Sequence, residues 1–255
     1  MRLLLDLGNS AVKWALATPG APEWLTGRLS YAQVDDPEGV VRALQSALDA
    51  QPTPECICIA SVLSPAWQSR LEAELRRTWP VPIRRLHSTA SAAGVANGYE
   101  RPEQLGVDRW AALIGARACA PAGACIVDVG TAITVDGLDA EGRHLGGAIY
   151  PGPRLHQEAL ARGTARLADA ASHACAALPA RSTDAAIAGG ISVGMAAAVQ
   201  ALAGEILAVC PDGAARLLTG GAAATVAPAL GAGWQHRPHL VLEGLLHWSM
   251  HEGLR

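Results

Sequence analysis

The first half of the chain alternates short apolar runs with polar turns and amphipathic segments. Two apolar runs flank the polar tip Gly8, Asn9 and Ser10, a pattern typical of two strands joined by a turn. Two later segments repeat apolar side chains at helical spacing, and the second begins with Ser64 and Pro65, which suit a helix start. Short apolar runs follow each helical segment. The predicted order is β-β-α-β-α-β over residues 3–8, 11–17, 37–50, 55–62, 64–79 and 81–86.

The second half repeats this opening after a loop at 97–107 and a predicted helix at 108–120. Residues 124–138 again form an apolar run, a turn and a second apolar run, and a third strand lies within 141–152. The remaining periodicity predicts two helices, a short strand that ends in a glycine turn, and a closing helix. These elements cover residues 153–170, 183–209, 214–221 and 244–253.

The two hairpins align residue by residue at their tips. Asp6 corresponds to Asp128, and Gly8 corresponds to Gly130, while Thr131 stands where the first hairpin has Asn9. A single Asp-x-Gly turn is common, but two copies inside apolar strands, one opening each half, indicate a duplicated module. We therefore expect an α/β protein of two closely packed domains, residues 1–120 and 121–255, with a cleft between them.

Composition narrows the class of protein. Half of the 255 residues are hydrophobic, so a large core is possible, and the net charge of −3 disfavours nucleic acid as the main partner. No segment predicts a secretory signal or a membrane span, so we expect a cytoplasmic protein. No C-x-x-C pair occurs, and His247 and His251 lack a third ligand at a recognisable spacing. Buried, reduced thiols are the favoured interpretation of Cys56, Cys58, Cys119, Cys125, Cys175 and Cys210.

The hairpin tips carry groups that suit a polyphosphate. Glycine allows backbone N–H groups to approach phosphate oxygens, and Lys13 lies close enough along the chain to reach them. Asp6 and Asp128 repel phosphate but suit a cation such as Mg²⁺ that neutralises it. Neutral hydrogen-bonding side chains are present at both tips, on Asn9, Ser10, Thr131 and Thr134.

Further candidate chemistry lies in three segments. In residues 97–110, Asp108 could accept a hydroxyl proton and Arg109 could bind a carboxylate or phosphate, although a helix cap with an exposed neighbour explains the same pair. Ser182 or Thr183 caps a helix whose glycines permit close packing. Residues 218–221 form a glycine turn against which an adenosine could lie, or a plain strand–helix connection.

The order of these motifs resembles that of the type III pantothenate kinases. The motifs are DLGNSAVKW, NGYERPEQLGVDRW, VDVGTAITVD, GGAIYPG, STDAAIAGG and LTGG, and they cover nearly the whole chain. The Asp-x-Gly hairpins alone are shared with the wider superfamily of acetate and sugar kinases, heat-shock ATPases and actin. The segment Leu-Gly-x-Asp-Arg after Asn-x-Tyr-x-x-Pro is much more specific to this family.

The resemblance implies a fold, a reaction and a set of site residues. It implies two tandem ribonuclease-H-like domains, as in actin-like ATPases, with ATP in the interdomain cleft and phosphorylation of pantothenate at its primary hydroxyl, the first step of coenzyme A synthesis. Asp108 matches the proton acceptor. The pantothenate contacts match Tyr99, Gly106, Val107, Asp108, Arg109 and Thr183, and the ATP-phosphate contacts match Asp6, Leu7, Gly8, Asn9, Ser10, Ala11, Val12, Lys13, Gly130 and Thr131.

The resemblance also implies ions and an oligomer. Asp128 matches a position that binds potassium or ammonium in many members, while Asp6 suits Mg²⁺ held through water. Family members are homodimers, so Thr183 could act on the pocket of the partner chain. Two alternatives remain open: a kinase or phosphatase of another small acceptor such as a sugar, acetate or polyphosphate, and a nucleotide-binding accessory or regulatory protein without turnover.

Overall fold

The computed structural model describes residues 1–255 except 22, 35, 164–177 and 252–255. The chain divides into two compact units. Unit 1 contains Met1–Pro121, Gly142–His144 and the C-terminal segment that begins at His239, and unit 2 contains Ala122–Glu141 and Leu145–Pro238.

Unit 1 is built on a five-stranded mixed sheet. Its strands are β1 (Arg2–Leu7), β2 (Ala11–Ala17), β3 (Leu25–Ser30), β4 (Cys56–Ser61) and β5 (Ile83–Arg85). Their order across the sheet is β3-β2-β1-β4-β5, in which β2 pairs antiparallel with β1 and β3, while β4 runs parallel to β1 and β5. The polar tip of the first hairpin therefore lies at the edge where the parallel strands end.

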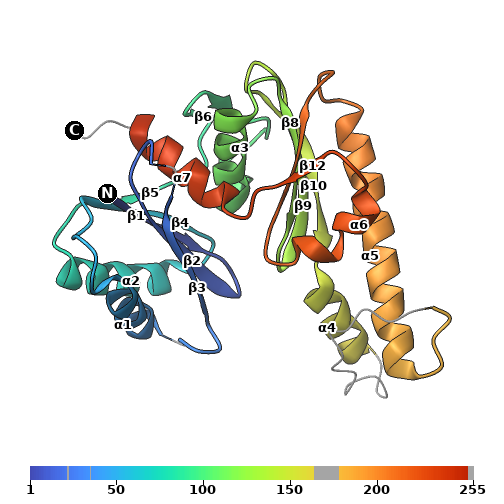
Figure 1. Ribbon diagram of the computed structural model, residues 1–255, viewed down its shortest axis with the longest axis horizontal. Helices are drawn as coiled ribbons and strands as arrows, with labels where there is room; N and C mark the ends of the chain where they lie inside the picture. The colour runs from blue at the N-terminus through green and yellow to red at the C-terminus, as the bar shows by residue number, and fades with distance from the viewer. Residues whose placement is uncertain (22, 35, 164–177, 252–255) are drawn as a thin grey trace. The chain divides into compact units, whose positions relative to one another are not determined.

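Helices cover both faces of this sheet (Figure 1). The helices of unit 1 are α1 (Pro37–Leu48), α2 (Pro65–Thr78), α3 (Val107–Cys119) and α7 (Leu240–His251), with a 3₁₀ turn η1 (Pro102–Gln104). On one face the side chains of Leu3, Leu5 and Leu7 pack with residues of α1 and α2. On the other face α3 and α7 lie against β1 and β4. Because successive strand residues point to opposite faces, β1 is buried on both sides.

Helices α3 and α7 approach each other closely through two glycines. A Cβ on Gly115 would overlap the carbonyl oxygen of Leu240, and one on Gly244 would overlap that of Ala111. No larger residue fits without separating the two backbones. Residues 239–251 therefore pack in unit 1, whereas the sequence suggested that the whole of 121–255 forms the second domain.

A small hairpin and a turn complete unit 1. Strands β6 (Ser91–Ala92) and β7 (Val95–Ala96) form a two-stranded ribbon before α3. The N–H of Ala96 donates to the carbonyl of Gly142, 2.8 Å away, and Ala96 forms a parallel bridge with Arg143. This contact explains why residues 142–144 belong to unit 1 although their neighbours in sequence belong to unit 2.

Unit 2 repeats the sheet of unit 1. Its strands are β8 (Ala124–Val129), β9 (Ala132–Leu138), β10 (His144–Pro151), β11 (Ala215–Thr219) and β12 (Trp234–His236). Their order is β10-β9-β8-β11-β12, with β8 antiparallel to β9 and β11 parallel to both β8 and β12. In both units an antiparallel hairpin is flanked by a third strand on one side and by two parallel strands on the other, which confirms the duplicated module.

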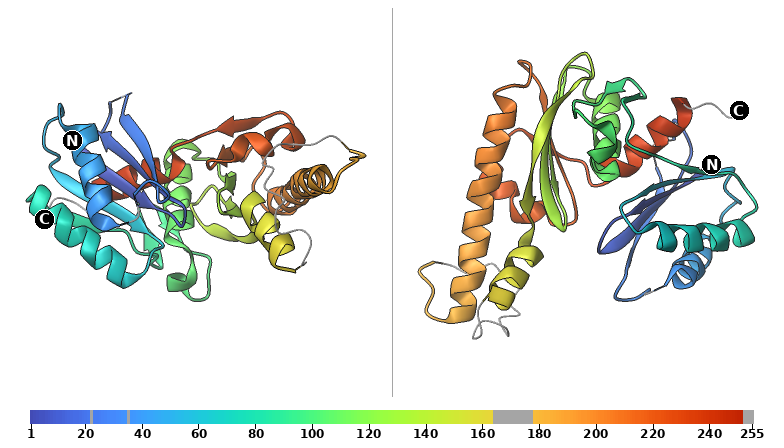
Figure 2. Two further views of the ribbon diagram at one scale, coloured as in Figure 1. Left: turned by 90° about the horizontal axis from the view of Figure 1, so that it is seen from below. Right: turned by 180° about the vertical axis from the view of Figure 1, so that it is seen from behind.

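Helices pack on the sheet of unit 2 as well. They are α4 (Pro153–Gly163), α5 (Thr183–Leu207), the short α6 (Ala227–Leu230) and the 3₁₀ turn η2 (Ala223–Thr225). The rear view in Figure 2 shows α5 running along the sheet, where Met195 and Val199 pack against Val127 and Val135. The predicted helix at 153–170 is confirmed as far as Gly163, and its remainder lies outside the described residues.

Strand β3 is one of the elements that the sequence did not predict, together with β6, β7, β12 and the short α6. Strand β3 was not predicted, because its residues LTGRLS show neither an apolar run nor a clean alternation, and the strand lies at a half-exposed sheet edge.

Helix α5 is long and apolar enough to cross a membrane by length and composition, and only 22% of its most apolar window is buried. The helix itself matches the one expected at residues 183–209.

The cysteines in the described residues are free thiols: Cys56, Cys58, Cys119, Cys125 and Cys210. Cys56 and Cys58 point to the same face of β4, with 4.0 Å between their sulfur atoms, and both are buried. Burial raises the pKa of the Cys125 thiol to about 12, so this group stays protonated. Cys175, which the sequence analysis grouped with these, lies outside the described residues.

Candidate active site

The first hairpin tip is closed by a backbone hydrogen bond and carries a buried acid. The N–H of Gly8 donates to the carbonyl of Ala11 at 3.2 Å, and Leu7 pairs with Val12 across the strands. Asp6 is only 7% exposed, and its Oδ2 lies 3.9 Å from Nζ of Lys13, its partner in the strand register. The tip therefore places one acid and one base side by side just below a turn of backbone N–H groups.

The next segment of the chain supports this tip. The N–H of Tyr31, which follows β3, donates to the carbonyl of Ser10 at 3.3 Å. Burial, with a smaller contribution from the charge of Asp6, raises the pKa of the Tyr31 phenol above its usual value. Sequence reasoning did not find this contact because it depends on β3, which lacks a clear strand pattern.

The second hairpin tip has the same plan with one residue fewer. The N–H of Gly130 donates to the carbonyl of Ala132 at 3.0 Å, and Val129 pairs with Ile133. Asp128 pairs with Thr134 in the strand register, so the position that corresponds to Lys13 is occupied by a neutral hydroxyl. The two tips are therefore alike in backbone but not in charge.

Two glycines pack directly against the second tip. Gly152 donates its N–H to the carbonyl of Thr131 at 3.1 Å, and a Cβ on Gly152 would overlap that same oxygen. Gly220 has a φ of +96°, and a Cβ there would overlap the carbonyl of Val129 and lie 2.5 Å from Oδ1 of Asp128. The glycines of the motifs GGAIYPG and LTGG thus hold the tip by close backbone contact, a role that the sequence analysis did not assign to either.

The predicted acid at residue 108 lies in the first turn of α3. Its Oδ1 accepts the N–H of Arg109 at 2.8 Å, and a Cβ on the preceding Gly106 would lie 2.6 Å from that oxygen. The absence of a side chain at Gly106 leaves room for the carboxylate beside the helix start. Negative charge is also stabilised there by the helix dipole.

Arg109 and Tyr99 form a polar pair inside unit 1. Arg109 is only 5% exposed, and its Nη1 donates to the hydroxyl of Tyr99 at 2.7 Å. Asn97 fixes the loop between them: its Oδ1 accepts the N–H of Tyr99 at 3.0 Å, and its Nδ2 donates to the carbonyls of Thr89 and Pro102. In the motif Asn-x-Tyr, Asn97 therefore stabilises the loop backbone, and Tyr99 provides the hydroxyl that bonds to Arg109.

A cavity of about 500 Å³ adjoins the start of α3. Gly106 and Val107 line it, together with Ser61 at the end of β4 and with His87 and Ser88, which follow β5. The hydroxyl oxygen of Ser88 is buried there without a hydrogen-bond partner. The predicted acceptor segment at 106–109 therefore borders a partly polar cavity large enough for a small molecule.

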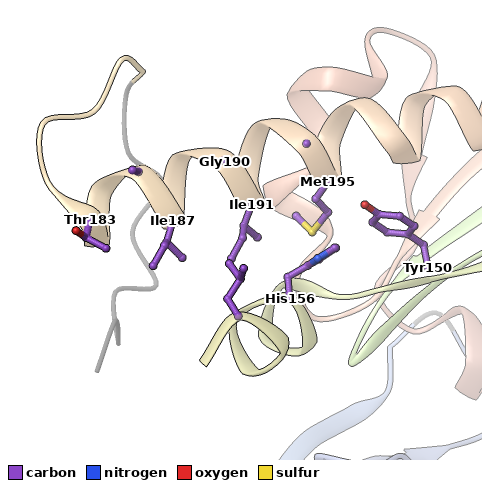
Figure 3. Close-up of a pocket in the computed structure, with 10 residues that line it drawn as sticks. Tyr150, His156, Thr183, Ile187, Gly190, Ile191 and Met195 are labelled. Carbon is purple, nitrogen blue, oxygen red and sulfur yellow. The ribbon is translucent and has the colours of Figure 1, made fainter. Parts of the chain in front are cut away.

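Thr183 belongs to unit 2, whereas Tyr99, Asp108 and Arg109 belong to unit 1. It is the first residue of α5, exposed, and preceded by Ser182, whose hydroxyl caps the helix by accepting the N–H of Ala185 at 3.3 Å. Figure 3 shows it at one end of a mainly apolar hollow of about 540 Å³ between α4 and α5. The hollow is lined by Tyr150, His156, Leu160, Thr183, Ile187, Ile191 and Met195, with small residues of α5 between them.

No group of three or more metal-ligating side chains occurs among the residues that the structure describes. The acids predicted to serve cations, Asp6 and Asp128, belong to unit 1 and unit 2 respectively. Each is one carboxylate beside a glycine turn, which suits an ion that obtains its other ligands from water and phosphate.

The duplicated sheet places the chain in a known fold class. A solved structure of component A of the (R)-2-hydroxyglutaryl-CoA dehydratase of Acidaminococcus fermentans superposes with a TM-score of 0.59 at 14% identity, covering 98% of this chain and 96% of the other. The activator of the 2-hydroxyisocaproyl-CoA dehydratase of Clostridium difficile, solved with bound ADPNP, gives 0.58 at 12% identity, covering 98% and 95%. The fold is therefore that of the actin-like ATPases and kinases.

Sequence comparison gives the family within this class. The family described as type III pantothenate kinase matches residues 2–205. A type III pantothenate kinase of Halorhodospira halophila is 64% identical over 255 residues and 100% of both chains, and one of Alkalilimnicola ehrlichii is 44% identical over 98% of both. The chain belongs to the type III pantothenate kinase family.

Proposed function

We propose that this chain transfers the γ-phosphoryl group of ATP to the primary hydroxyl of pantothenate, the first step of coenzyme A synthesis. The observation that carries the proposal is full-length identity of 64% to a pantothenate kinase, combined with Asp108 at the start of α3 beside the Tyr99–Arg109 pair.

Asp108 acts as the general base. Its Oδ1 is engaged by the N–H of Arg109 at 2.8 Å, which fixes the orientation of the carboxylate, while the second oxygen can accept the proton of the acceptor hydroxyl. The hydroxyl oxygen then attacks the γ-phosphorus, and the bond from that phosphorus to the bridging oxygen of ADP breaks. Most of the acceleration in such a transfer comes from positioning and charge stabilisation.

Arg109 and Tyr99 hold the acceptor. Arg109 is buried, and a guanidinium can bind a carboxylate such as that of pantothenate through two parallel N–H donors. Arg109 donates one N–H to the Tyr99 hydroxyl, and this hydrogen bond fixes the orientation of the other N–H groups of the guanidinium. Gly106 and Val107 contribute backbone to the same region and line the adjoining cavity.

The two hairpin tips bind the phosphates. At the first tip, residues 6–13 offer backbone N–H groups and the ammonium of Lys13, and at the second, Gly130 and Thr131 offer a backbone turn and a hydroxyl. Gly152 and Gly220 keep that second turn in place. Lys13 gives only the first tip a positive charge, so we assign the more strongly charged terminal phosphates to its neighbourhood.

Mg²⁺ accompanies ATP, and the buried carboxylate of Asp6 fits a role as its anchor through water. When bound, Mg²⁺ neutralises charge on the phosphates. Asp128 is the candidate ligand for a monovalent cation, potassium or ammonium, because its carboxylate lies against the bare backbone of Gly220. Both assignments rest on donor chemistry and on the family resemblance.

The protein acts as a homodimer in the cytoplasm, and Thr183 serves the acceptor site of the partner chain. Helix α5 presents apolar side chains outward, among them Val193 at 56% exposure, and Thr183 opens the apolar hollow beside it. An apolar face of this kind is better explained by a second copy of the chain than by solvent.

The function is tested by offering several acceptors. With ATP and Mg²⁺, the purified protein should form ADP with a kcat/KM for pantothenate at least tenfold higher than for acetate or hexoses. A tenfold ratio corresponds to a difference of about 1.4 kcal/mol in transition-state binding. A preference for a sugar, or nucleotide binding without turnover on any acceptor, would contradict the proposal.

A further inference from the structure

The ring of Tyr99 stacks on the ring of His144, a residue far from it in the sequence. His144 stacks on it with 5.7 Å between ring centroids and 20° between ring planes. His144 is only 3% exposed and is the first residue of β10, 45 positions away in the chain. No pattern in the sequence around His144 indicated a role for it.

The turn that carries His144 is fixed against the β6–β7 ribbon. Gly142 has a φ of +84°, and its carbonyl accepts the N–H of Ala96 at 2.8 Å. A Cβ on Gly142 would overlap the carbonyl oxygen of Gly94, so a larger residue would push the turn away from the ribbon. Arg143 forms a β-bridge with Ala96, and the next residue, His144, packs against Tyr99.

Tyr99 is therefore constrained at three separate points. Asn97 holds its backbone N–H, Arg109 donates to its hydroxyl, and His144 covers one face of its ring. A tyrosine has two rotatable side-chain bonds, and a stacked neighbour together with a hydroxyl partner leaves one arrangement of both. The same contacts orient the Arg109 guanidinium, which lies 5.4 Å from the Tyr99 ring centroid.

We infer that His144 is a positioning residue for the acceptor: it acts through Tyr99, and through Tyr99 on Arg109, without touching the substrate. The inference rests on the proposed function, in which Tyr99 and Arg109 contact pantothenate. Its physical content is preorganisation, since a Tyr99 ring already held in its binding rotamer loses less entropy when the acceptor binds.

The expected signature is a change in acceptor affinity with little change in the other steps. Replacing His144 with Leu keeps most of the buried volume and removes the flat ring, so the KM for pantothenate should rise about three- to tenfold, the size expected from one aromatic pair. The KM for ATP and the affinity for ADP should stay within about twofold of wild type, because the hairpin tips are untouched. His144→Phe keeps the ring and should stay close to wild type.

A double-mutant cycle tests whether His144 acts through Tyr99. If it does, His144→Leu should have no further effect on the pantothenate KM in a Tyr99→Ala background. Gly142→Ala offers an independent route, because it displaces the turn without altering either ring, and it should reproduce the effect of His144→Leu. Gly213→Ala is its matched control: this glycine has a φ of +81° but nothing within 4 Å of an added Cβ.

The outcomes separate this inference from the proposed function. A normal pantothenate KM in Tyr99→Ala would contradict the substrate contact itself, and the inference would fall with it. A raised KM in Tyr99→Ala with a normal KM in His144→Leu would overturn the inference alone. The inference would also be overturned if His144→Leu still raised the pantothenate KM in the Tyr99→Ala background. The same holds if His144→Phe raised that KM while His144→Gln kept it normal, because either result assigns His144 a role other than stacking.

Discussion

Lys13 Nζ lies 3.9 Å from Oδ2 of Asp6, its cross-strand partner at the first hairpin tip, and the corresponding pair at the second tip is Asp128 and Thr134. The duplicated module thus keeps its acid in both copies and its base in one. Asp6 holds the ammonium of Lys13 beside the backbone turn, where the ammonium can bind an anion. The first copy is therefore the positively charged end of the proposed phosphate site.

Removal of that ammonium should weaken ATP binding selectively. Lys13→Met deletes one charge-assisted contact to phosphate, worth about 1.5–3 kcal/mol, so the KM for ATP should rise roughly ten- to a hundredfold. The KM for pantothenate should change much less. Steady-state kinetics with each substrate varied in turn measures both. Arg70→Met is the control, because it removes an equally positive but exposed side chain that pairs with Glu38.

Asp108 should be essential for turnover and dispensable for nucleotide binding. Asp108→Asn keeps the size of the side chain at the start of α3 but removes the basic oxygen, so kcat should fall at least about a hundredfold. Calorimetric titration with ADP should give an affinity close to wild type. Near-normal turnover in this variant would show that another group accepts the proton.

The second tip should depend on the close approach of Gly152. Gly152→Ala places a methyl group against the carbonyl oxygen of Thr131 and should displace the turn, which raises the KM for ATP while the pantothenate KM remains close to wild type. Gly204→Ala is the matched control, since nothing lies within 4 Å of its added Cβ and alanine favours the helix. Equal kinetics for the two variants would remove Gly152 from the phosphate site.

Potassium or ammonium should activate the enzyme through Asp128. Activity in a buffer whose monovalent cation is only sodium should increase on addition of potassium, and Asp128→Asn should abolish the increase, because the carboxylate provides the charged ligand. The assay is the ADP-coupled reaction at constant ionic strength, with choline chloride as the control salt. A flat response in the wild-type chain would leave Asp128 without a cation role.

Subunit mixing should reveal whether Thr183 acts across a dimer. Asp108→Asn and Thr183→Ala chains are each expected to be defective alone, but a mixed dimer would contain one site with both residues intact. Random reassociation should then restore about a quarter of the wild-type activity. Size-exclusion chromatography checks the oligomer, and activity that never exceeds the sum of the two separate variants would place both residues in one chain.

Strong local patterns predicted most elements, and weak ones did not. The helix at 64–79 was anticipated from Ser64 and Pro65, and the structure starts α2 at Pro65 with the Ser64 hydroxyl accepting the N–H of Trp67. Strand β3 was missed because an edge strand with exposed Leu25 and an internal Gly27 carries almost no periodic signal. Trp14 explains Gly27, since a Cβ there would lie 2.5 Å from its indole ring.

The site shows the same division. Asp108 and Arg109 were chosen from sequence because an acid and a base at a helix start suit acceptor chemistry, and their proposed roles await the experiments above. The bracing of Tyr99 by His144 had no counterpart in the sequence, because the two residues approach only through the turn at Gly142.

By itself, the sequence determined the duplicated hairpins, the order of the strands and helices with strong local patterns, and the family, since each of these depends on neighbouring residues or on motifs in a fixed order. Only the tertiary structure decided that α7 packs on α3 through Gly115 and Gly244, and that residues 142–144 lie beside β7. Contacts of this second kind join segments far apart in the chain, and they exist because backbones fit where a side chain is absent, a condition that no local pattern of apolar and polar residues encodes.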